Sequence, residues 1–125
     1  MICRLDPIEL IPGDGLPLRF DLKDDDDPQA PVFDNGDTVK IIFTAYDRTW
    51  EVAGTIGENN SVSALVPPSA TEEIGDSRVK DVHFCLHIYP QAGPRRTVTF
   101  GEDKERGIEG QAWYPVRVLR CHPDQ

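Results

Sequence analysis

The chain has 125 residues, of which 22 are Asp or Glu and 13 are Lys or Arg, so its formal net charge is -9 at pH 7. A chain of this length can bury one hydrophobic core, and we expect a single domain over residues 1–125. Its negative field repels phosphate backbones and anionic headgroups, so we expect neither nucleic acid nor a membrane as a direct partner. The charge serves solubility or docks the chain onto a basic neighbour, and both readings stay open.

Short segments of alternating polarity follow one another along the chain, separated by 11 prolines and 10 glycines. Turn residues at this spacing are typical of β-sandwiches and barrels. We therefore predict an all-β fold of seven strands, and residues 8–11 are a candidate for an eighth strand. The seven predicted strands are 16–22, 38–45, 49–56, 61–66, 82–89, 95–100 and 113–120.

The first of these strands alternates strictly, and Pro17 places its start at a sheet edge because proline donates no ladder hydrogen bond. The segment 82–89 is the longest β pattern and indicates a central strand. One helical turn is predicted near residues 69–75, with Ser69 as N-cap, Glu72 completing a capping box and Gly75 ending it.

The remaining segments are predicted to be connections and ends. Residues 1–10 form an N-terminal arm, 101–111 a mobile loop and 121–125 a C-terminal tail. The odd cysteine count and wide spacing indicate reduced thiols in a chain that folds in a cytoplasm. These cysteines are Cys3, Cys85 and Cys121. We see neither a secretory leader nor an apolar run near the roughly 18 residues of a membrane span.

Two charged groups are candidates for an interaction surface. The acidic run Asp24, Asp25, Asp26 and Asp27 is a solvated loop or a calcium-binding one, although its spacing does not match an EF-hand. Arg95 and Arg96 lie at the tip of a predicted hairpin, where they are solvated charges or part of a basic patch with Arg78 and Lys80. Such a patch would bind an acidic partner or a second copy of the same chain.

Zinc chemistry is suggested by His83, Cys85 and His87, which share one face of a strand. Their spacing argues against a single site, because alternate strand residues lie about 6.5–7 Å apart and the outer pair about 13 Å apart. Two ligands with His122 remain conceivable, but we expect two half-exposed histidines beside an unreactive thiol.

Enzymatic machinery is not expected, because no motif for a nucleophile, a phosphate loop or a zinc hydrolase is present. We accordingly predict no catalytic residue, no cofactor and no metal. Trp50 and Trp113 lie in alternating segments, where packing is a commoner role than sugar stacking.

The order of the elements resembles the immunoglobulin-like domain of tailed-bacteriophage proteins, such as the N-terminal domain of upper baseplate proteins. The resemblance covers roughly residues 11–120 and is carried by Pro12-Gly13-Asp14 before a strand, Asp24–Asp27, Thr38-Val39, Pro67-Pro68 and Gly93 to Val98. It implies an immunoglobulin-like antiparallel β-sandwich with a non-enzymatic structural role.

The resemblance further implies a protein that folds in the host cytoplasm and is located in the virion. There it would join a symmetric assembly with other virion proteins, or as a homo-oligomer, in the tail, the baseplate or a fibre attachment. A capsid cement or decoration protein is the alternative within this class. An acidic cytoplasmic module that inhibits a basic target is the alternative from another class.

Overall fold

The computed structural model describes residues 2–3, 8–23, 27, 29–45, 48–76, 81–100 and 112–119. These residues form strands and one helix, which confirms the predicted all-β fold with one short helix. In chain order they are β1 (Ile2–Cys3), β2 (Ile8–Leu10), β3 (Leu16–Lys23), β4 (Thr38–Ala45), β5 (Arg48–Ile56), β6 (Ser61–Val66), α1 (Pro68–Ile74), β7 (His83–Tyr89), β8 (Arg96–Thr97), β9 (Thr99–Phe100) and β10 (Tyr114–Val118). The predicted loop 101–111 and tail 121–125 lie outside the described residues.

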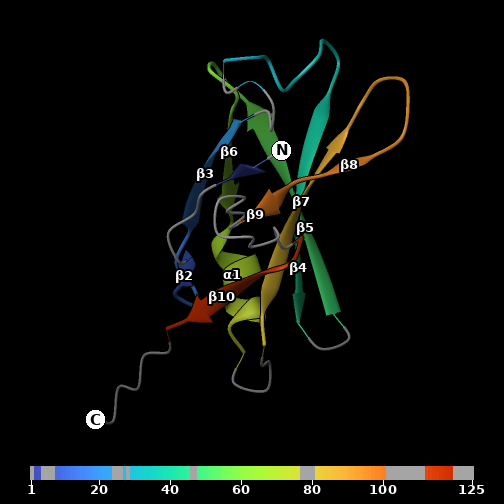
Figure 1. Ribbon diagram of the computed structural model, residues 1–125. Coiled ribbons are helices and arrows are strands. Elements are labelled where there is room, and N and C mark those ends of the chain that lie inside the picture. Colours follow the sequence, from blue (N-terminus) through green and yellow to red (C-terminus); the bar gives the residue numbers. More distant parts are fainter. Residues whose placement is uncertain are drawn as a thin grey trace, which may run out of the picture.

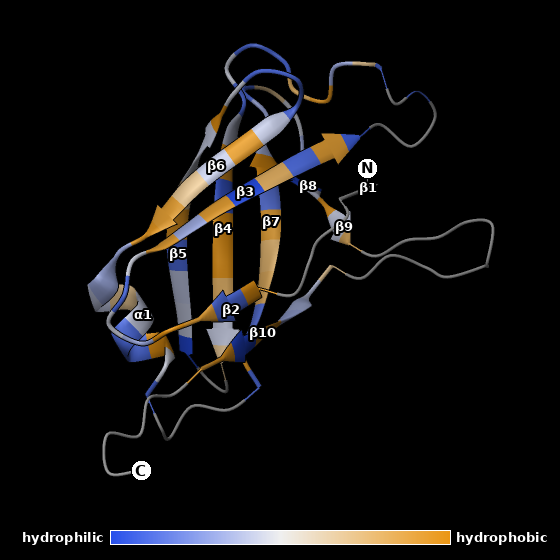
Figure 2. Cartoon of the chain, turned by 90° about the vertical axis from the view of Figure 1, so that its left-hand side faces the viewer, coloured by the Kyte–Doolittle hydropathy of each residue, from blue (hydrophilic) through white to orange (hydrophobic). Residues whose placement is uncertain are grey.

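The strands belong to one nearly closed sheet, in the order β2-β10-β7-β4-β5-β6-β3-β1-β9, with β8 paired to β7. The sheet folds over on itself, so that β3 and β6 cross in front of β4, β5 and β7 (Figure 2). Strand β7 pairs with β4, β8 and β10, which confirms the central position predicted for it. Pro17 pairs with Leu65 of β6, and no described strand lies opposite it on the other side of β3.

The resemblance implies an antiparallel arrangement, and the sheet departs from it at two places. Strand β1 runs parallel to β9, and β2 runs parallel to β10. Both pairings place residues from the predicted N-terminal arm beside strands from the second half of the chain, so residues 2–3 and 8–10 of the arm are part of the sheet. The two-residue strand β1 has no periodicity that a sequence reading could detect.

The predicted strand 95–100 is divided at Val98. Residues 96–97 pair with β7, whereas residues 99–100 pair with β1. At the break, the Val98 N–H donates to the Leu86 carbonyl at 3.0 Å, and the Val98 side chain is buried. The chain thus passes from one part of the sheet to another, and Phe100 enters the core.

Helix α1 begins differently from its predicted form. Pro67 is the N-cap and makes no side-chain hydrogen bond, so the capping box predicted from Ser69 and Glu72 is wrong. The fixed φ of Pro68 suits the first helical position and starts the helix without a cap. Gly75 ends the helix as predicted, and Ile74 is buried in the core.

The core is centred on the ring of Phe84. Its centroid lies 5.7 Å from that of Phe20, 6.0 Å from that of Phe43 and 5.1 Å from that of Phe100. Tyr114 completes the cluster, with its ring 6.1 Å from Phe84. These rings come from β3, β4, β7, β9 and β10, so the cluster joins both halves of the folded sheet.

Three connections meet at the end of the sheet opposite α1 (Figure 1). They are residues 29–37 before β4, residues 57–60 between β5 and β6, and residues 90–95 between β7 and β8. We call this surface the loop end.

Candidate functional site

The loop end contains or adjoins the described members of the predicted interaction surface. Asp27 lies at its border and is exposed, with its carboxylate accepting a hydrogen bond from the Gln29 N–H at 3.0 Å. Arg95 is exposed, whereas Arg96 is partly buried. The other predicted members, Asp24, Asp25, Asp26, Arg78 and Lys80, lie outside the described residues.

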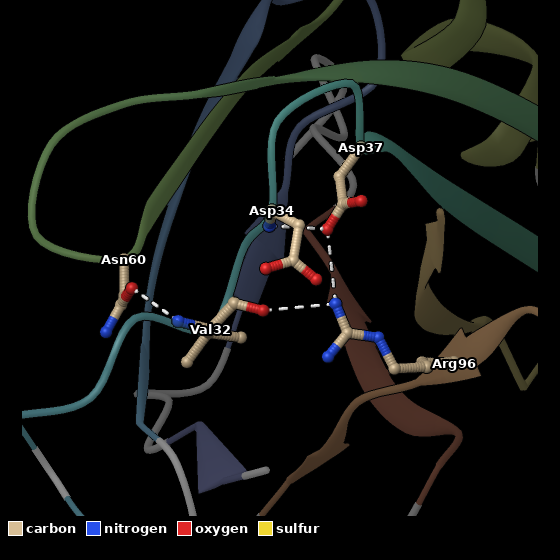
Figure 3. A network of polar contacts seen from close by, with 5 residues as sticks. All are labelled: Val32, Asp34, Asp37, Asn60 and Arg96. Atoms are coloured by element: carbon tan, nitrogen blue, oxygen red, sulfur yellow. Dashed lines mark hydrogen bonds and ion pairs between the residues drawn. The ribbon is translucent and has the colours of Figure 1, made fainter. Parts of the chain in front are cut away.

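Arg96 is turned toward the first of the three loops (Figure 3). Its Nη2 donates to the Val32 carbonyl at 3.0 Å and to Asp37 Oδ2 at 3.2 Å. The Asp37 side chain is only 1% exposed and that of Arg96 is 39% exposed, so this ion pair is shielded on the carboxylate side. Arg96 therefore holds the loop in place, and Arg95 is the arginine of the pair that faces solvent.

Residues 34–37 form a tight turn at the tip of this loop. The Asp37 N–H donates to the Asp34 carbonyl at 3.2 Å, and Gly36 has a φ of +88°. A glycine with positive φ at the third position is the mark of a type II turn. The Asp34 N–H in turn donates to Asp37 Oδ2 at 2.9 Å, so one carboxylate oxygen serves both the turn and Arg96 (Figure 3).

Asn60 fastens the same loop from the opposite side. Its Oδ1 accepts from the Val32 N–H at 2.9 Å, and its Nδ2 donates to the Ala30 carbonyl at 2.9 Å. Its own carbonyl accepts from the Leu22 N–H at 3.0 Å. A φ of +59° gives Asn60 the left-handed conformation that asparagine tolerates better than most residues.

The three loops form one surface because these contacts join them. Gln91 adds a further contact, since its side chain packs against the open side of Gly36, where a Cβ atom would lie 2.5 Å from Oε1. The exposed charged side chains of the loop end are Asp34, Glu58 and Arg95. With Asp27 at the border, negative charges outnumber positive ones on the described surface.

The sequence pointed to Arg96 as part of an interaction surface, but it assigned no role to Asn60. The dipeptide Asn59-Asn60 indicates a turn and nothing more. The hydrogen-bond partners of Asn60, Ala30 and Val32, lie 30 and 28 residues away in the chain, and no local sequence pattern reveals them.

A second chemical group lies on β7, where Cys85 and His87 are in contact. Their Sγ and Nε2 atoms are 2.9 Å apart. Both side chains are buried, so the prediction of a half-exposed His87 is wrong: neighbouring structure covers both faces of β7. His83 is partly buried and does not join them, because its Nδ1 contacts the Asp81 carbonyl at 2.9 Å.

The environment keeps this pair neutral. Burial raises the pKa of the Cys85 thiol to about 11, although the positive charge of Arg95 opposes the rise. Burial and the same charge lower the pKa of His87 from its ordinary value of 6.5. Because the thiolate is the reactive form of cysteine, a thiol with so high a pKa is a poor nucleophile near neutral pH. Within the described residues, no group of three or more metal-ligating side chains is gathered.

Comparison with known proteins gives no match to this chain, whether among protein-family models, curated proteins or solved structures. The one helix of the described residues is too short and too polar to cross a membrane.

Proposed function

We propose that the chain is a non-enzymatic binding module that joins a larger protein assembly through its loop end. The observation that carries the proposal is that the first loop is held by Asn60 of the second loop and by Arg96, the first residue of β8, directly after the third loop. A loop that is already fixed loses less conformational entropy on binding than a free one. The contacts made by these two residues therefore preorganise a surface for a partner.

The charge of the loop end favours a basic partner. Asp34 and Glu58 are exposed, and the nearby Arg95 offsets only part of their charge. Complementary charge of this kind raises association rates and orients the encounter. In the sequence, the acidic run Asp24–Asp27 directly precedes this part of the chain.

A tailed-bacteriophage particle is the assembly we propose, with the chain as a tail, baseplate or fibre-attachment component. The support for this is the order of turn and strand elements along the sequence, together with an all-β fold. A capsid cement or decoration protein is the alternative position in the same particle. The acidic surface also favours a second candidate, an inhibitor that covers a basic site on one target protein.

Location and binding are tested separately. Particles purified from the source of the chain should contain it at a fixed copy number relative to the major structural proteins, measured by quantitative mass spectrometry. If the chain occurs only in the soluble extract, in a stoichiometric complex with one basic protein, the virion role is wrong and the inhibitor role is supported.

Charge reversal tests the surface. Glu58→Lys changes the loop end, and Glu72→Lys makes the same change in charge on the exposed side of α1. We expect the first variant to weaken partner binding and reduce its salt dependence, and the second to bind like the parent chain. Equal effects of the two variants would show that the loop end is not the docking surface.

A further inference from the structure

The tip of the loop end contains the dipeptide Asn35-Gly36, and both residues are accessible to solvent and free to react with each other. Both are exposed. Among the described residues, neither the Asn35 side chain nor the Gly36 N–H has a hydrogen-bond partner. The turn is held by its flanking residues instead, through the bond from the Asp37 N–H to the Asp34 carbonyl.

We propose that Asn35 is a site of spontaneous deamidation, in which the main chain of the turn supplies the nucleophile. The Gly36 backbone nitrogen loses its proton and attacks Cγ of the Asn35 side chain. The new C–N bond closes a five-membered succinimide, and the side-chain nitrogen leaves as ammonia. Water then adds to one of the two imide carbonyls and opens the ring, leaving aspartate or isoaspartate at position 35.

Gly36 favours this reaction because it has no Cβ to obstruct the approach of its nitrogen to the neighbouring side chain. The exposure of Asn35 gives water and hydroxide access to the amide. Asparagine is counted among the thermolabile residues of proteins. The turn thus combines an unbonded side-chain amide, a backbone nitrogen on a residue without a Cβ, and exposure to solvent.

The other two asparagines of the chain provide an internal comparison. Asn60 holds the Val32 N–H and the Ala30 carbonyl with its side-chain amide, and the following N–H, from Ser61, donates to the Glu58 carbonyl. Both reacting groups of Asn60 are therefore engaged. Asn59 is followed by Asn60, whose side chain crowds the attacking nitrogen. Conversion should be selective for Asn35.

The products change the loop end in two ways. Either one replaces a neutral amide by a carboxylate, which makes the formal net charge one more negative than -9. Isoaspartate also lengthens the main chain by one methylene, inside the turn that brings Asp37 to Arg96. The effect on docking rests on the proposed function, whereas the chemistry does not.

The test is a timed incubation of the intact folded chain at mildly alkaline pH, followed by peptide mapping and isoaspartate-specific enzymatic methylation. We expect Asn35 to convert with isoaspartate among the products. Conversion of Asn60 should be about thirtyfold slower, as the loss of two ordinary hydrogen bonds implies. Asn35→Gln should remove the isoaspartate signal from the peptide that contains residue 35 and leave the fold unchanged.

Two results would overturn the proposal: an intact Asn35 amide while Asn59 or Asn60 converts, or conversion to aspartate with no isoaspartate, which excludes the succinimide. Partner binding is measured on the same aged samples. Deamidation that leaves binding unchanged would support the modification and count against docking by the loop end, so the two proposals fail separately.

Discussion

Replacement of Arg96 by alanine tests the physical basis of the preordered loop end. The substitution removes the two hydrogen bonds that Nη2 donates, to the Val32 carbonyl and to Asp37 Oδ2. It also leaves the Asp37 carboxylate, whose side chain is 1% exposed, without its cation. The Asp34 N–H remains as a donor to that carboxylate.

The expected loss of unfolding free energy follows from these contacts. Hydrogen bonds to charged groups contribute about 1.5–3 kcal/mol each, and breaking a fully buried ion pair costs about 3–5 kcal/mol. The Arg96 side chain is 39% exposed, so water can replace part of what it provides. We therefore expect Arg96→Ala to lower the free energy of unfolding by about 2–3 kcal/mol.

Urea denaturation measures this loss as a shift in midpoint at unchanged slope. Arg95→Ala is the matched control, because the neighbouring arginine faces solvent and should cost less than about 0.5 kcal/mol. Combining Arg96→Ala with Asp37→Asn removes the stranded charge, and the pair should show a coupling energy of about 1–2 kcal/mol. A loss no larger than that of Arg95→Ala, or strict additivity of the two substitutions, would refute the assigned ion pair.

Three further substitutions test other parts of the fold. Asn60→Ala removes two hydrogen bonds and puts a less suitable residue at a φ of +59°, so urea denaturation should show a loss of about 2–3 kcal/mol, of which Asn60→Gly restores the conformational part. Phe84→Ala removes the ring that joins both halves of the sheet and should cost about 3–5 kcal/mol in the same assay; a loss near 1 kcal/mol would contradict the central position of this ring. Because the pKa of His87 is lower in the folded chain than in the unfolded one, His87 of the unfolded chain is protonated at a higher pH as the solution is acidified. The contribution of neutral His87 to the free energy of unfolding should therefore be fully present above the ordinary pKa of 6.5 and be lost as the pH falls below it. In His87→Gln that part of the pH dependence should be absent; identical pH profiles for variant and parent would exclude His87 as its source.

The strands with the clearest alternation were predictable from sequence. The predicted ranges 38–45 and 61–66 coincide with β4 and β6. Each residue of such a strand faces either the core or solvent, so the pattern in the sequence records the structure directly. Val39, Ile41 and Phe43 alternate along β4, and all three are buried in the core.

The features that depend on distant partners were not predictable in this way. The division at Val98 arises because β8 and β9 pair with different strands, and the sequence of 95–100 is compatible with one continuous strand. Burial of His87 arises because neighbouring structure covers the second face of β7. The roles of Asn60 and Arg96 require residues 29–37 to lie against the loop 57–60 and against β8, and the nearly closed sheet brings these segments together.

The parallel pairings of β1 with β9 and β2 with β10 bear on how the chain folds during synthesis. Residues 8–10 emerge early from the ribosome, yet their partners at 116–118 are made more than a hundred residues later. Until then the inner strands can pair with one another, and β1 can pair with β3, but β2 has no partner among the described strands until β10 is made. Pairing over such separations slows folding, because a large loop must close before the contact is gained. The last step of folding is therefore expected to be the pairing of β2 with β10.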